Sequence, residues 1–180
     1  MANKKIIELM TIASIAIAWV MCDLINFEVF HFLKSDKYLY SIYLLAGLRL
    51  VAIILFGYIG FFGIFLGHTF ASIAIRHLDA TEAIWLGFLS SFASLLAHKL
   101  WQSFIDKNDS FYGISPIQLF YLVVINATLV ALFRFSFLFI TNHNTSIEIF
   151  YGTISANISG SLIFLYLIKA GNSAYRRIKT

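Results

Sequence analysis

Residues 43–67 read YLLAGLRLVAIILFGYIGFFGIFLG, and this stretch decides the fold class. Two long apolar runs lie on either side of the short link 57–60, and the first run contains one charged residue, Arg49. Such a link is too short for a loop domain but long enough for a turn between two helices. We therefore expect an antiparallel helical hairpin, in which Gly63 and Gly67 have the four-residue spacing that allows close helix contact.

The rest of the chain is also apolar. Of its 180 residues, 60% are hydrophobic and 12% are charged, whereas soluble domains have about 25% charged residues. Since a helix needs about 20 apolar residues to cross the roughly 30 Å hydrocarbon core, we predict an all-α integral membrane protein, a six-transmembrane-helix bundle in one domain, 1–180. The predicted spans are residues 6–22, 39–57, 60–77, 83–101, 116–140 and 148–169. Residues 23–37 are expected to form an amphipathic loop along the outer interface, or a docked cap.

The distribution of lysine and arginine predicts the orientation. If the N-terminus is cytoplasmic, eight of the thirteen basic residues lie in cytoplasmic segments, three lie on the opposite side, and two lie within spans. With six spans, this asymmetry places both termini in the cytoplasm. The same scatter of basic residues argues against nucleic acid as a partner.

Two arginines lie within predicted spans. A charge at the centre of a membrane helix costs about 2.5–3.5 kcal/mol on insertion scales, and the nine acidic residues fall in loops or at helix ends. Arg49, near the middle of its span, therefore either bonds backbone carbonyls of a neighbouring helix or binds an anionic ligand. Arg134 lies nearer the outer end of its span, where snorkelling to the interface is favoured.

Three further polar residues lie at mid-depth on other spans: His68, Asn126 and Asn157. They either converge with the arginines on one pocket or form hydrogen bonds between helices. The candidate ligand-binding residues are therefore Arg49, His68, Asn126, Asn157 and Arg134. The small residues expected at helix contacts are Gly60, Gly63, Gly67, Ser159 and Gly160.

Patterns typical of catalysis are missing from the sequence: paired carboxylates, a nucleophile elbow, a glycine-rich phosphate loop with a lysine, and a histidine pair at metal spacing. Cys22 is the only cysteine. We therefore expect a protein that is not an enzyme and has no metal site, and no cofactor can be assigned.

The 43–67 hairpin resembles the first class of bacterial membrane-associated sensor domains. In those domains a glycine precedes an apolar run, a glycine and a short turn end it, and a glycine-bearing span returns. The similarity covers residues 39–169, but Leu44-Leu45-Ala46 stands where the family favours Trp-Pro or Pro, and the chain stops at Thr180 without a cyclase or kinase. The resemblance implies a stand-alone sensor in the bacterial inner membrane that binds a small ligand and acts through a separate protein.

A second resemblance is architectural. Six spans in a chain of this size are similar to the substrate-binding subunits of energy-coupling-factor vitamin transporters, which also work through a partner. A structural accessory subunit of a larger membrane complex is the third alternative. The expected partners are the lipid bilayer, another membrane protein or complex, and an anionic small molecule.

Overall fold

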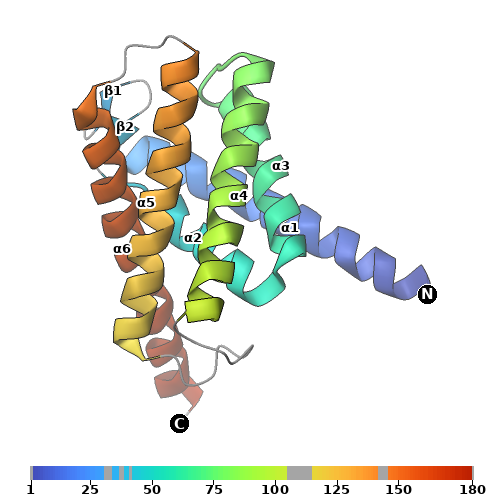
Figure 1. The fold of residues 1–180 in the computed structure, drawn as a ribbon. Helices are drawn as coiled ribbons and strands as arrows, with labels where there is room; N and C mark the ends of the chain where they lie inside the picture. The colour runs from blue at the N-terminus through green and yellow to red at the C-terminus, as the bar shows by residue number, and fades with distance from the viewer. Residues whose placement is uncertain are drawn as a thin grey trace.

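The computed structural model is helical apart from one two-stranded ribbon (Figure 1). It describes residues 2–30, 34–36, 39–40, 42–104, 115–141 and 146–179, with side chains for 3–29, 42–104, 115–141 and 146–171. The all-helical prediction is confirmed, and the described residues form six helices. The helices are α1 Ala2–Phe30, α2 Leu45–Phe56, α3 Tyr58–Ala74, α4 Ala80–Phe104, α5 Pro116–Ile140 and α6 Ile147–Lys179. The antiparallel ribbon pairs β1 Lys34–Asp36 with β2 Leu39–Tyr40.

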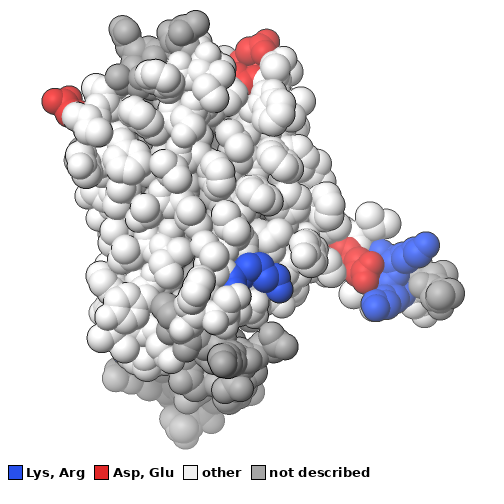
Figure 2. Space-filling model, in the orientation of Figure 1, with Lys and Arg blue, Asp and Glu red and all other residues white. Residues whose placement is uncertain are grey.

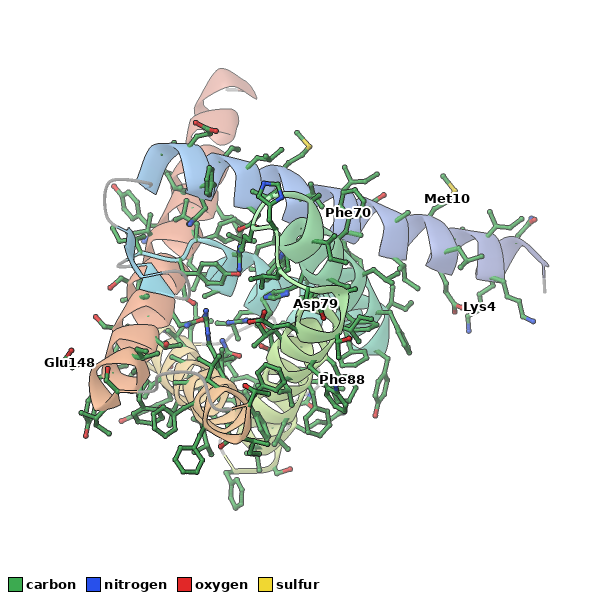
Figure 3. The ribbon with its side chains drawn as sticks, turned by 90° about the horizontal axis from the view of Figure 1, so that it is seen from above. Lys4, Met10, Phe70, Asp79, Phe88 and Glu148 are labelled. Atoms are coloured by element: carbon green, nitrogen blue, oxygen red, sulfur yellow. The ribbon has the colours of Figure 1, made fainter. Side chains whose placement is uncertain are left out.

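Four helices pack in chain order around a short central one. Helix α3 packs on α4, α4 on α5 and α5 on α6, and α2 contacts all four of these helices. Helix α1 packs mainly on α3 and crosses the other helices obliquely (Figure 1). Seen from above, the end of α1 that carries Lys4 and Met10 extends away from the bundle (Figure 3).

Four of the six helices are long and apolar enough to cross a membrane: α1, α4, α5 and α6. Helices α2 and α3 are apolar but shorter, and α2 rises only about 18 Å. The second predicted span is thus a shorter helix than expected, because residues 39–40 belong to β2 and the helix begins at Leu45. The prediction of a loop over residues 23–37 is wrong for residues 23–30, which continue α1.

Helix α1 continues past residue 22 because its polar residues there find partners inside the bundle. Asp23 and Asn26 are buried, Asp23 pairs with an arginine, and Asn26 Oδ1 accepts a hydrogen bond from the backbone N–H of Leu44 at 3.0 Å. The N–H of Tyr43 donates to the carbonyl of Ala156 at 3.2 Å. These bonds satisfy the backbone where α2 begins inside the protein, as buried N–H and C=O groups require.

Local sequence signals account for two helix boundaries. Ser115 and Gln118 form a reciprocal capping box, with Pro116 in the first turn, so α5 begins where the sequence predicts. Gly57 ends α2 and precedes α3 with φ +54°, a conformation that favours glycine. Outside the helices, Asp79 accepts a hydrogen bond from the N–H of Thr81 at 2.9 Å, which lowers the pKa of that carboxyl.

Glycines mark the closest helix contacts. A Cβ at Gly60 would meet the backbone of Ala52 on α2, whereas a Cβ at Gly63 or Gly67 would lie 2.7 Å from Ile15 or Trp19 of α1. The expectation that Gly63 and Gly67 face the preceding span is therefore wrong. Spacing defines a helix face but not which neighbour covers it, and α1 crosses α3 there.

Close contact between α2 and α6 depends on another glycine. A Cβ at Gly160 would meet the backbone carbonyl of Tyr43 just before α2. The adjacent Ser159 is half-buried.

The two largest buried clusters lie on either side of α2. Trp19 and Ile64 belong to the cluster toward α1 and α3, and Trp101 belongs to the cluster toward α4 and α5.

Candidate functional site

A small cavity of about 30 Å³ lies inside the bundle, lined by residues of α2 to α6, by Tyr43, and by residues between α3 and α4. A space of this size is enough for a small polar group or about one or two water molecules. The lining includes three arginines and a histidine and, within the described residues, no Asp or Glu. Its polar lining residues are Tyr43, Arg49, His68, Arg76, Ser90, Arg134 and Asn157.

Arg49 reaches the cavity from α2 and is 1% exposed. Its guanidinium donates to the Ser90 hydroxyl on α4 and, at 2.6 Å, to Asn157 Oδ1 on α6. The Asn157 amide nitrogen donates to the carbonyl of Thr153 at 2.7 Å, which holds the amide oxygen toward Arg49. Arg49 is therefore held by neutral side chains of two helices, and its Nε has no partner among the described residues.

Arg76 reaches the same cavity from the turn that follows α3. It pairs with Asp23 of α1 at 2.5 Å and donates to the Tyr43 hydroxyl at 3.3 Å. Its guanidinium carbon also lies 5.7 Å from the centre of the Tyr43 ring, within cation–π range. Asp23 thus supplies a counter-charge from outside the cavity lining.

His68 connects the cavity to α1. It is buried on α3, its Nδ1 lies 3.3 Å from the Ser72 hydroxyl, and its ring centre lies 5.5 Å from that of Trp19. Trp19 and Asp23 are four residues apart on α1, so one face of that helix touches two residues that line the cavity. A change in the position of His68 or Arg76 at the cavity would therefore alter a direct contact with α1.

Arg134 lines the cavity from α5 and is half-buried. The sequence favoured snorkelling for this residue, but the structure places it on the same cavity as Arg49. Arg49 and Arg134 bring positive charge to this space beside Arg76, whose charge is balanced by Asp23. The planar fork of arginine can donate two parallel hydrogen bonds to a carboxylate or phosphate.

The structure brings together four of the five residues proposed as ligand-binding: Arg49, His68, Arg134 and Asn157. Asn126 is fully buried on α5 but is not among the lining residues, and neither side-chain atom has a partner in the described part of the chain.

Sequence reasoning missed Tyr43, Arg76 and Ser90. The predicted orientation counts Arg76 among the three basic residues on the side opposite the cytoplasm. The pattern of the chain could not reveal that these three residues meet Arg49, since they come from separate segments. The described residues include no group of three or more His, Cys, Asp or Glu side chains that could hold a metal ion.

No known protein family, no curated protein and no solved structure matches this chain. The functional inference therefore depends on the geometry of the cavity and on the surface of the bundle.

Proposed function

We propose that this chain is an integral membrane protein of the bacterial inner membrane. Large apolar side chains are exposed on α1, α4, α5 and α6, which favours contact with lipid. The face of the bundle in Figure 2 is nearly uncharged. Acidic residues lie at its upper edges, a single basic patch lies on its lower half, and further charges lie on the projecting end of α1. From Glu82 to Lys99 α4 rises about 25 Å, and from Glu148 to Lys169 α6 rises about 31 Å. Both lengths fit a hydrocarbon core of about 30 Å.

Within this proposal, all six helices lie in the membrane and both termini face the cytoplasm. The α2–α3 hairpin is short, but α2 packs inside the protein and its first backbone groups find protein partners. Backbone that begins or ends at membrane depth is tolerated where protein surrounds it. The excess of lysine and arginine in the segments assigned to the cytoplasm supports the orientation.

The function that the geometry supports best is binding of an anionic group in the three-arginine cavity. The protein is then a non-enzymatic, sensor-like subunit that acts through a separate protein. The observation that carries this proposal is the cavity lining, in which Arg49 and Arg134 lie beside Arg76, the partner of Asp23, and the described lining residues include no Asp or Glu. The contacts of His68 and Arg76 with α1 supply a path from the cavity to a helix that a partner could contact.

A substrate-binding subunit of a transporter would use the same cavity, and the two roles differ in the partner. An accessory role in a larger complex is supported by a different observation. A groove of about 560 Å³ between α1 and α2 is lined mainly by apolar side chains such as Met10, Ile15 and Phe56. A neighbouring membrane helix could pack there.

The test compares Arg49→Met with the matched control Lys99→Met, which removes an exposed charge from α4. Each protein is purified in mild detergent, its melting temperature is measured, and mass spectrometry identifies retained small molecules and proteins. We expect Arg49→Met to melt near the wild-type temperature, because relief of a buried charge offsets the cost of unpairing Ser90 and Asn157. It should also lose an anionic molecule that wild type and control retain.

Early melting of Arg49→Met, with bound molecules reduced only in proportion to folded protein, would make Arg49 a structural residue and reject the proposal. The proteins that co-purify separate the roles: a kinase or cyclase favours sensing, paired ATPases favour transport, and an enzyme complex favours the accessory role.

A further inference from the structure

An open groove of about 760 Å³ runs along the outer face between α4 and α5. Its centre is apolar, with Trp85 and Leu89 from α4 and Phe133, Phe137 and Ile140 from α5. Ligand pockets typically have volumes of about 300–1,000 Å³. In a membrane this face would meet lipid chains, so the groove suits an apolar chain.

The groove and the three-arginine cavity lie on opposite sides of the same wall. Leu89 lines both of them, and Phe133 in the groove is adjacent in sequence to Arg134 in the cavity. Next to Leu89, Leu86 lines the cavity and belongs to the small cluster against which Phe137 packs. Leu89 therefore lies between the two spaces, and its side chain can change rotamer without any change of fold.

The dimensions of the two spaces restrict the ligand. A cavity of about 30 Å³ suits a small head group, and a planar carboxylate needs less room than a tetrahedral phosphate. On α4 the residues that line the groove extend from Thr81 to Leu89, about 12 Å along the helix axis, which fits within one leaflet of the roughly 30 Å hydrocarbon core.

The charges at the two ends select the direction of such a ligand. Arg49 and Arg134 line the cavity, whereas Asp79 and Glu82 line the far end of the groove. Asp79, labelled in Figure 3, lies at the start of α4. An anionic head is attracted by the arginines and repelled by the two carboxylates, so only one orientation is favourable.

We propose that the site binds an amphiphile with a carboxylate head and a single apolar chain. The head lies in the cavity between Arg49 and Arg134, and the chain passes over Leu89 into the groove between α4 and α5. This inference depends on the proposed anion site and adds the chemical class of its ligand.

The test uses the full chain in nanodiscs of zwitterionic lipid and the probe 12-bromododecanoate, whose bromine quenches nearby tryptophan fluorescence. Trp85 lies in the groove, so we expect saturable quenching in wild type that disappears in Trp85→Phe. Arg134→Gln should weaken apparent binding about tenfold or more, because it removes a charge-assisted hydrogen bond. The matched control Lys99→Gln, an exposed position on α4, should bind as wild type does.

Two further measurements test the carboxylate head and the apolar chain of the ligand separately. The uncharged alcohol 12-bromododecanol should give only the non-saturable quenching expected from partition into lipid. Leu89→Phe narrows the passage, so it should abolish saturable quenching by the acid while acetate still raises the melting temperature.

Each contrary result has its own meaning. Saturable quenching by the alcohol would reject the carboxylate in the cavity. Displacement of the probe by acetate as readily as by dodecanoate would reject the role of the chain and leave the anion site standing. If neither acetate nor dodecanoate binds or changes the melting temperature, both this inference and the proposed function fail.

Discussion

Asp23 shows how a single residue can link an outer helix to the cavity. Its carboxylate is 2% exposed and lies 2.5 Å from the guanidinium of Arg76, which also contacts Tyr43. Removal of one member of a buried ion pair is destabilising, because the remaining charge is kept from water and has no opposite charge beside it. The Asp23–Arg76 pair therefore fixes α1 against the end of α3.

Asp23→Asn should lower the free energy of unfolding by about 3 kcal/mol, since it leaves the Arg76 charge largely buried without its partner. The measurement is thermal or denaturant unfolding of the purified protein, with Glu28→Gln, an exposed acid on the same helix, as the control. The double variant Asp23→Asn/Arg76→Gln should recover part of the loss. A single Asp23→Asn variant as stable as wild type would mean that the pair does not hold α1.

At the scale of the elements, α1 is attached to α3 through two glycines. Gly63 and Gly67 leave room for Ile15 and Trp19, and both larger residues are buried. Since a protein interior tolerates neither voids nor overlap, side chains at these positions would separate the helices. This separation of α1 from α3 would also break the contact of Trp19 with His68, which lines the cavity.

Replacement of Gly63 or Gly67 by Leu should reduce the yield of folded protein in detergent and lower the melting temperature, because no room exists for the added side chain. Gly171→Leu is the matched control, since a Cβ there meets nothing within 4 Å. Size-exclusion profiles and thermal unfolding of the three variants provide the measurement. Equal stability of all three would show that α1 does not pack on α3 in the membrane.

At the scale of the whole molecule, charge and length agree on how the bundle would lie in a membrane. Acidic residues Glu82 and Glu148 occur in the first turns of α4 and α6, and Lys99 and Lys169 occur toward their other ends. This arrangement also suits the helix dipoles, which favour negative charge at the N-terminus and positive charge at the C-terminus.

Topology can be measured by cysteine labelling in a Cys22→Ser background. Cysteines placed near Lys107 and Thr180 should react only when the cytoplasmic side is accessible, and cysteines near Asp36 and Asn142 should react from outside. The reason is the eight-to-three distribution of basic residues between the two sides. Labelling of position 180 from outside would reverse the proposed orientation. If the N-terminus and the C-terminus were labelled from opposite sides of the membrane, an even number of spans would be excluded.

The sequence by itself determined the helical class and several boundaries of the fold. Helix α5 occupies residues 116–140 as predicted, because its capping box and proline act within one turn. The turn at Gly57 follows from a backbone conformation that glycine adopts readily. The sequence also identified Arg49 and Arg134 as costly charges that need partners, because that cost depends on the apolar neighbours along the chain.

Only the tertiary structure decided which of these residues meet. The Arg76–Asp23 pair, the contact of Arg49 with Ser90, and the exclusion of Asn126 from the cavity lining join or separate residues that are far apart in sequence. Each depends on the rotation and crossing of helices. Apolar periodicity fixes the buried face of a helix, but the neighbour against that face is selected by packing of the whole bundle. For this reason α1, predicted as a short span, became the helix whose buried face reaches the cavity residues.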